Sequence, residues 1–523
     1  MFIFELVIAL LLVGAVLSLW AARIGVPYPA LLALTGAALA LIPGMPDVAL
    51  DPELALVLFV APTLLDAAYD ASPRDLRDNI GPVASFALGA VGLTIVTVAY
   101  VARLVVPDMS WAAAITLGAI VAPPDASAAT VVLRQLRLPH RLLVILEGES
   151  LFNDASALLV YRIAVAAAVT GIFSGWSVIP MLALTCGGGV AAGFVLAHLY
   201  LRFVHTVEDV SISILMSFIS TFAVWIIADR LGLSAIIAVV CYAMTIARYV
   251  PGRTDARRRI AAYAVWDVVI FVLNVLAFVL IGLQLRAIVT RMEPGQWHLY
   301  GLTAFAVCAT VIISRIVWVM SHNTIARWRI RRFGARLRRP MTLPTIGTGM
   351  IISWCGMRGI VTLAAALALP HTPQAMFPYR DLIVLCAFCV VLTTLVIQGV
   401  TLRWLIERVG IPDDGVVERE VATARHETAR VALEALDSEA GEASPNLREK
   451  YRARLQSAEE RSAGLPAESL SKQLEVHRRL IEAQRRALLD LRARDVIGDA
   501  AFHVVEEELA LLELALQSGA SSS

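Results

Sequence analysis

The sequence predicts an all-α polytopic membrane protein with about 13 spans, and this prediction rests on composition, segment length and the placement of arginine. Of the 523 residues, 58% are hydrophobic and only 17% are charged. A soluble chain of this length carries more charge and divides into several domains. The net charge of +1 gives no reason to expect nucleic acid as a partner.

The apolar segments have the length of about 20 residues that a membrane-spanning helix needs. We place them at 2–22, 27–43, 52–70, 81–106, 111–133, 140–171, 177–204, 209–229, 233–250, 261–288, 298–325, 342–369 and 380–408. The first contains Glu5 and has no basic residue before its apolar run, so we expect a retained span rather than a cleaved signal peptide. The predicted domains are a membrane part over 1–410 and a polar tail over 411–523.

Most arginines outside the spans lie in the odd-numbered connections, from Arg23 to the run between Arg327 and Arg339. Because cytoplasmic loops collect basic residues, this bias predicts an N-terminus outside and a tail in the cytoplasm. Arg162 and Arg315 lie inside spans and are left out of this comparison between odd-numbered and even-numbered connections. The run over 327–339 is either an ordinary topology anchor or a site for anionic lipid.

The tail differs in kind from the membrane part. It is rich in Glu, Arg and Ala and contains Lys450 and Lys472, the only lysines of the sequence. Apolar residues recur at helical spacing over 470–491, and a second helix is expected over 500–517. No glycine-rich nucleotide loop is present, so we interpret the tail as a small helical domain that packs or dimerises.

The sixth span contains four polar residues in one short motif, Glu149-Ser150-Leu151-Phe152-Asn153-Asp154. At about 100° per residue, the four polar side chains fall within roughly 140° of one helix face. Ionised side chains at the bilayer centre are costly, and those that occur there generally line an ion path or pair with one another. The motif therefore predicts an ion-binding site, with a polar helix end at the membrane interface as the alternative.

The fifth span contains a signal for a broken helix, because Pro123 and Pro124 stand directly before Asp125. Proline removes backbone donors and leaves carbonyl groups without helical partners. Such breaks are tolerated at membrane depth where the backbone lines a polar cavity. Free carbonyls beside a carboxylate would suit a monovalent cation, and Asp125 could at the same time cap the next half-helix.

The twelfth span contains a buried cation, Arg358, between Gly356 and Gly359. An unpaired guanidinium in apolar surroundings is very costly, so we expect an acidic partner, and Glu149 is the candidate. Interrupted helices in both halves of a chain are typical of an inverted-repeat transporter.

The third span contains two carboxylates, Asp66 and Asp70. Asp70 lies close to a predicted cytoplasmic loop and is expected to be solvated. Asp66 lies about one turn deeper, where it either faces a cavity or sits at the interface.

These motifs resemble the monovalent cation/proton antiporter 1 family, the bacterial sodium/proton exchangers related to animal sodium/hydrogen exchangers. The resemblance covers the membrane part and extends from GESLFND to the sequences PTLLDA, APPD, WDVVIFVLNVLAFVLIGLQL and GMRG. It implies a thirteen-span inverted-repeat fold with crossed broken helices in a core domain and a separate dimerisation domain. It further implies a homodimer in the bacterial cytoplasmic (inner) membrane, an elevator-like movement and a transporter rather than an enzyme.

By this resemblance, Asp154 is the carboxylate that binds the cation and the proton in turn, and Asn153 supports it. Ser150 and Asp125 are implied as further cation ligands or polar neighbours, and Asp66 as an acid that approaches the site.

The resemblance also implies an ion pair between Glu149 and Arg358. The sequence departs from the family where Pro124 replaces a frequent threonine and Ala126 replaces a frequent proline.

The predicted activity is electroneutral exchange of a monovalent cation for H⁺, with Na⁺ as the expected cation and K⁺ or Li⁺ as alternatives. A proton and a cation would exclude each other at Asp154. We expect no cofactor, and a role in pH homeostasis would follow. A cation channel is the second hypothesis, and the scattered His residues do not suggest a membrane enzyme.

Overall fold

We analysed a computed structural model of the chain. It describes residues 2–42, 51–133, 136, 138–170, 175–291, 294–333, 344–372 and 375–438, with a few isolated residues between 449 and 505. Of the predicted features, most of the tail helices over 470–491 and 500–517, and the second half of the arginine run, lie outside the described residues. The chain divides into two compact units, Met1–Asp413 and Asp414–Ser523.

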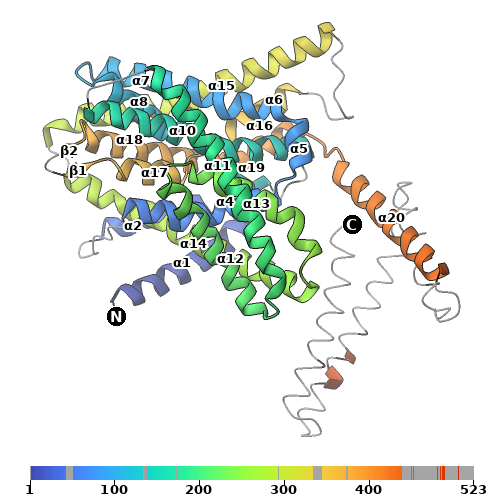
Figure 1. Ribbon diagram of the computed structural model, residues 1–523. Helices are drawn as coiled ribbons and strands as arrows, with labels where there is room; N and C mark the ends of the chain where they lie inside the picture. Colours follow the sequence, from blue (N-terminus) through green and yellow to red (C-terminus); the bar gives the residue numbers. More distant parts are fainter. Residues whose placement is uncertain are drawn as a thin grey trace. The chain divides into compact units, whose positions relative to one another are not determined.

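Where the structure describes it, the first unit is helical apart from one short strand pair, β1 and β2 (Figure 1). In order, its elements are α1 (Phe2–Ile24), α2 (Tyr28–Ala40), α3 (Pro52–Ala55), η1 (Leu56–Val60), α4 (Ala61–Asp70), α5 (Pro73–Asp78), α6 (Ile80–Ala84), η2 (Ser85–Ala90), α7 (Val91–Val105), α8 (Trp111–Val121), α9 (Ala126–Leu133), α10 (His140–Thr170), α11 (Gly175–Phe203), η3 (Val204–Thr206), α12 (Val210–Arg230), α13 (Ala235–Tyr249), η4 (Val250–Gly252), α14 (Ala256–Arg291), η5 (Pro294–Gln296), α15 (Trp297–Phe333), α16 (Ile346–Trp354), α17 (Ile360–Leu367), β1 (His371–Thr372), β2 (Ala375–Met376), α18 (Arg380–Thr393), η6 (Thr394–Gln398) and α19 (Gly399–Val409).

Seven of the described helical stretches are long and apolar enough to cross a membrane. They are Ile80–Val105, His140–Thr170, Ala183–Phe203, Val210–Arg230, Arg257–Thr290, Trp297–Arg332 and Arg380–Val409. Shorter apolar helices, such as Tyr28–Ala40 and Trp111–Val121, accompany them. The prediction of an all-helical protein with many membrane spans is therefore confirmed.

Polar side chains mark where several of these helices begin. Ser110 accepts a hydrogen bond from the Ala113 N–H at the start of α8, and Ser234 does the same for α13. At α16, Thr345 and Thr348 form a reciprocal capping box. Such caps satisfy backbone donors that have no partner within the helix, which is essential where water is scarce.

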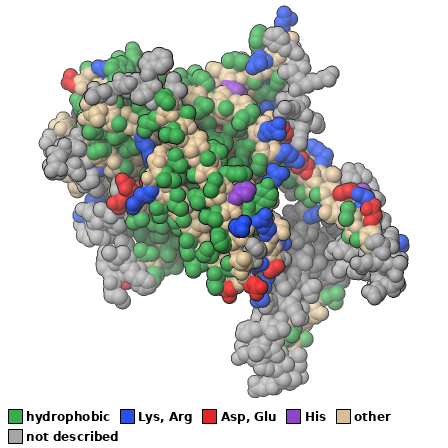
Figure 2. Space-filling view, in the orientation of Figure 1, with side chains coloured by type: hydrophobic (Ala, Val, Ile, Leu, Met, Phe, Trp, Pro, Cys, Tyr) green, Lys and Arg blue, Asp and Glu red, His purple; other side chains and the backbone are tan. Residues whose placement is uncertain are grey.

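The buried side chains form two main clusters. The larger one joins α2, α8, α14, α15 and α18, and the smaller one joins α4, α11, α12 and α13. Helices α11 and α13 run side by side (Figure 1). Hydrophobic side chains also predominate on the surface of this unit (Figure 2), with Phe305 exposed to 74%. An apolar exterior of this kind fits a lipid surrounding.

Helices α2 and α14 approach closely because glycines face each other. A Cβ atom on Gly282 would overlap the carbonyl oxygen of Ala33, and one on Gly36 would overlap that of Val279. Small residues at helix contacts are the usual device for tight packing in membranes.

In the second unit, α20 (Val416–Ser438) is described as a continuous helix. Arg430 pairs there with Glu427 and Glu434, one helical turn away on either side. Pairs at this spacing support an exposed helix.

We expect Gly282→Ala to destabilise the protein by about 1–3 kcal/mol, because the added methyl group must push two backbones apart. Gly301→Ala is the matched control, since a Cβ at Gly301 would meet nothing within 4 Å. Thermal unfolding in detergent measures both variants. Equal melting temperatures would contradict the close α2–α14 packing.

Candidate ion-binding site

Two interrupted helices meet inside the first unit. Helix α8 ends at Val121 and α9 begins at Ala126, whereas α16 ends at Trp354 and α17 begins at Ile360. The two connections, 122–125 and 355–359, contact each other through a hydrogen bond of 2.7 Å from the Asp125 N–H to the Met357 carbonyl. The breaks thus coincide with the proline pair and with the glycine-flanked arginine of the sequence.

The two glycines beside Arg358 make room for side chains from other elements. A Cβ on Gly359 would overlap the carboxyl group of Asp125, and one on Gly356 would overlap the side chain of Arg315. Neither glycine has a positive φ. Their role is therefore close approach rather than unusual backbone geometry.

Asn153 fixes the first connection from α10. Its Nδ2 donates to the Pro124 carbonyl at 2.6 Å, and the side chain is fully buried. Its Oδ1 has no hydrogen-bond partner among the described residues. Asn153 therefore stabilises a carbonyl released by the proline break, beside Asp125.

Arg358 caps the broken end of α8. Its Nε donates to the Val121 carbonyl at 3.1 Å, its Nη2 to the Ala122 carbonyl at 3.3 Å and its Nη1 to the Gly356 carbonyl. Its own N–H donates to Thr394 Oγ1 at 3.0 Å. A guanidinium at the C-terminal end of a helix satisfies orphan carbonyls and complements the negative end of the helix dipole.

The expected pairing of Glu149 with Arg358 is wrong. Glu149 pairs instead with Arg315 of α15, in a bidentate contact of 2.6 and 3.0 Å between side chains that are only 2–3% exposed. Arg315 also donates to the Ile352 carbonyl at 3.1 Å. The prediction failed because it assumed that Arg358 needs a carboxylate, whereas the carbonyls of the broken helices solvate it. A second arginine inside a span, Arg315, was the overlooked signal.

These contacts also change the expected ligand set. The carbonyls of Val121 and Ala122 accept hydrogen bonds from Arg358, and that of Pro124 accepts one from Asn153. Three of the backbone oxygens at the break are thus already engaged.

Side-chain oxygens are the remaining candidate ligands for a cation near the first connection. Asp154 and Ser150 lie on α10, and Asp154 is close enough to Asp125 for their charges to interact. Two carboxylates in apolar surroundings repel each other unless a proton or a cation is present. Among the described residues, no group of three or more His, Cys, Asp or Glu side chains forms a metal site.

Asp66 lies in a different place. It lines a cavity of about 290 Å³ together with Asp70, Asp267 and Tyr69, between α4 and helices α11 to α14. Asp66 therefore lines a cavity that Asp125 and Asp154 do not line. A role of Asp66 in cation binding stays a prediction.

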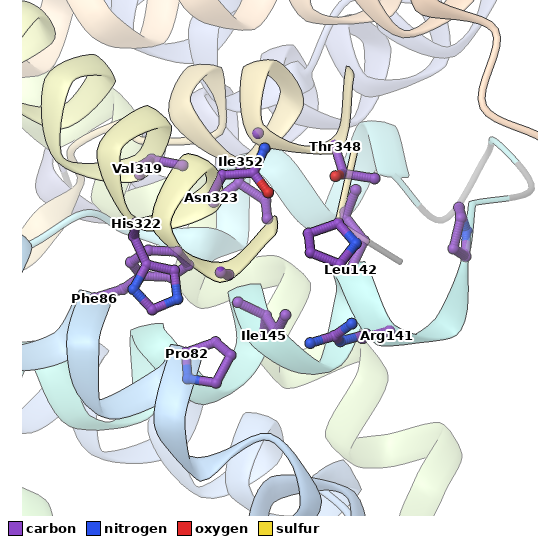
Figure 3. A pocket seen from close by; sticks show the side chains of 14 residues that line it. Pro82, Phe86, Arg141, Leu142, Ile145, Val319, His322, Asn323, Thr348 and Ile352 are labelled. Atoms are coloured by element: carbon purple, nitrogen blue, oxygen red, sulfur yellow. The ribbon is translucent and has the colours of Figure 1, made fainter. Parts of the chain in front are cut away.

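A second, small cavity of about 70 Å³ lies at the beginning of α10 (Figure 3). Arg141, His322 and Thr348 surround it, together with apolar residues such as Phe86. His322 Nδ1 lies 2.9 Å from Ser85 Oγ, which ties α15 to the start of η2. The lining of this cavity is largely apolar, so we interpret the cavity as part of the packing around the first turn of α10 and not as an ion site.

Comparison with known proteins decides the family. The model of the transmembrane sodium/hydrogen exchanger family matches residues 7–408. The chain belongs to this family. An uncharacterized Na⁺/H⁺ exchanger of Mycobacterium tuberculosis is 31% identical over 98% of the chain and 96% of its own length. The uncharacterized exchanger YjcE of Escherichia coli is 31% identical over 88% and 82%.

A relative from Bacillus pumilus, named as a sodium, potassium, lithium and rubidium/H⁺ antiporter, is 28% identical over 94% of the chain and 74% of its length. The fold is similar to that of the sodium proton antiporter MjNhaP1 of Methanocaldococcus jannaschii, with a TM-score of 0.60 and 16% identity over 78% of the chain and 98% of that structure. The chain is thus a multi-pass monovalent cation/proton antiporter and not an enzyme.

We expect Arg315→Ala to lower the free energy of unfolding by about 3–5 kcal/mol, because it leaves the Glu149 carboxylate buried without a partner. A double-mutant cycle with Glu149→Gln measures the coupling between the two side chains. The parallel cycle of Glu149 with Arg358 is the control and should give a clearly smaller coupling. The reverse order of couplings would restore the pairing that the sequence suggested.

Proposed function

We propose that the protein exchanges one Na⁺ for one H⁺ across the bacterial cytoplasmic membrane by alternating access, without net charge movement. The observation that carries this proposal is the hydrogen bond of 2.6 Å from Asn153 to the Pro124 carbonyl, which brings the adjacent carboxylates Asp154 and Asp125 together where two interrupted helices cross. With Ser150, these carboxylates form an oxygen site, and hard monovalent cations prefer oxygen ligands.

Competition between the two ions follows from this geometry. A cation near Asp154 and Asp125 offsets their repulsion, and a proton on one of them does the same. An empty pair would carry uncompensated charge through apolar surroundings, at a large cost. Exchange is obligatory because only the protein that carries a proton or a cation changes between its inward-open and outward-open states. A pH gradient can then drive cation export and support pH homeostasis.

One-for-one exchange is supported by the groups around Asp154 that do not titrate in the cycle. Position 153 is an asparagine, which cannot carry a proton. Glu149 is already engaged in a buried ion pair with Arg315. No lysine precedes Lys450, so no membrane lysine supplies a second proton. A single charge thus moves in each direction.

K⁺/H⁺ or Li⁺/H⁺ exchange is the second candidate. The name of the Bacillus pumilus relative includes sodium, potassium, lithium and rubidium, which favours a broad selectivity. Selectivity differs between these ions through the size of the site and the number of its ligands.

The finer architecture belongs to the same proposal. The seven long stretches, the shorter α1, α2 and α13, the interrupted pairs α8–α9 and α16–α17 and the stretch over 52–70 together give about 13 spans. The two interrupted pairs suggest an inverted repeat. We further propose a homodimer with an elevator-like movement, an outside N-terminus, a cytoplasmic tail after residue 410, and anionic lipid at Arg327–Arg339.

Asp154→Asn should abolish exchange while the protein stays folded, because an amide cannot alternate between proton and cation. Proteoliposomes with a pH-sensitive dye measure proton flux after addition of Na⁺, K⁺ or Li⁺ over a pH series. Asp108→Asn, an exposed aspartate between α7 and α8, is the control and should keep the wild-type rate. Sodium-driven flux of wild-type size in Asp154→Asn would sink the assignment.

Electroneutral exchange predicts that a sodium jump at symmetric pH gives no steady current on a solid-supported membrane. The same preparation must show proton flux with the dye. A steady current with coupled proton flux would mean that more than one proton moves per cation. A current without proton flux would instead identify a cation channel.

A further inference from the structure

Gln398 stands out among the buried polar residues of the membrane unit. It is fully buried, and neither its Oε1 nor its Nε2 has a hydrogen-bond partner among the described residues. Buried polar groups are nearly always hydrogen-bonded, and each exception requires an explanation. A carboxamide presents both donors and acceptors, so a water molecule satisfies it better than a bare cation does.

Gln398 ends a π-helical segment that contacts the second connection. Thr394, the first residue of η6, accepts a hydrogen bond from the Arg358 N–H. Gly399, the residue after Gln398, lies against Met357 and Pro27, because an added Cβ would be 3.4 Å from Met357 Sδ and 2.8 Å from Pro27 Cγ. π-helical turns frequently occur at functional sites.

The neighbouring residues on α2 and α14 extend this polar region to Asp125. Tyr28, next to Pro27, interacts with the side chain of Asn274 and with the charge of Asp125. The Asn274 side chain is itself buried. Among the described residues, the charged groups around the two connections are Asp125, Arg358 and the Arg315–Glu149 pair. The other titratable groups there are Tyr28, Cys308 and Cys355.

The arrangement of helices separates this region from the Asp154 side. Helix α9, which follows Asp125, packs against α10 and also against α2 and α19. Asp154 lies on α10, whereas Tyr28 begins α2 and Gln398 directly precedes α19. Asp125 thus has polar neighbours from two sets of helices.

We propose that Gln398 binds an ordered water beside the crossing, and that this water and the Tyr28 hydroxyl, which Asn274 positions, form a proton route to Asp125. The cation reaches Asp154 from the α10 side. The proton passes along hydrogen bonds to the Asp125 carboxylate, and no other group is consumed. Gln398 is a positioning residue in this scheme, because it acts through the water. The inference rests on the proposed antiport.

The test uses the full-length protein with Gln398→Leu, Gln398→Asn and the control Leu395→Ile, a fully buried apolar position on the same π-helical segment. Gln398→Leu should fold normally, because it removes a polar group without a protein partner. Its maximal exchange rate should fall about tenfold, the equivalent of one hydrogen bond, with a displaced pH–rate profile. Its apparent KM for Na⁺ should stay within about twofold of wild type.

Gln398→Asn keeps the amide and should recover a large part of the rate. Equal losses in the Asn and Leu variants would show that side-chain length and not the amide matters, and would overturn the inference. A wild-type pH–rate profile in Gln398→Leu would also overturn it.

Radiolytic hydroxyl-radical labelling provides a readout that needs no transport. Met357 is fully buried, so its oxidation in the wild-type protein reports a nearby bound water. The label should be lost in Gln398→Leu and kept in Leu395→Ile. Label retained in Gln398→Leu contradicts the water site. The wild-type protein could show no exchange while the labelling of Met357 still depends on Gln398. This result would contradict the proposed antiport and would still support the water site.

Discussion

The contact between the two helix breaks is the constraint on which the rest of the membrane unit depends. Breaking a helix at membrane depth exposes carbonyl and amide groups that lipid cannot satisfy. Here the breaks satisfy each other, through the bond from Asp125 to Met357 and through the guanidinium of Arg358 at the end of α8. Asn153 and Thr394 then tie the two connections to α10 and η6. The proposed ion site follows from this arrangement, because the bond from Asn153 to Pro124 brings the neighbouring residues Asp154 and Asp125 close together.

The separation of the two arginines gives each a distinct task. Arg358 is solvated by peptide carbonyls, and these contacts stabilise the broken helices. Arg315 neutralises Glu149 in a bidentate pair, and it also reaches the last turn of α16. A buried pair of this kind contributes little net stability, whereas loss of one partner is costly. Its structural role is to tie α10 to α15 and to the end of α16 beside the crossing.

Sequence reasoning predicted what is local and missed what is long-range. The membrane helices, the break before Asp125 and the polar face of α10 follow from apolar length, proline and helical spacing, which are properties of short segments. The partner of Glu149 does not, because it depends on how α10 packs against α15, more than 160 residues further along the chain. Packing between distant helices also forms the cavity that Asp66 lines. It likewise leaves the Gln398 amide without a hydrogen-bond partner among the described residues. The sequence does show two arginines inside predicted spans, Arg315 and Arg358, and either of them is a candidate partner for Glu149.

The proposed one-for-one stoichiometry agrees with the formal charges around the crossing. Glu149, Asp125 and Asp154 are acidic side chains, and Arg315 and Arg358 are basic ones. With all five ionised, one negative charge would be in excess, and in the proposed cycle a single proton or a single monovalent cation would restore neutrality. A divalent cation would leave an excess of the opposite sign in surroundings that screen charge poorly. Under this proposal the charge balance favours a transported ion of one charge, and it does so through the two arginines as well as through the carboxylates.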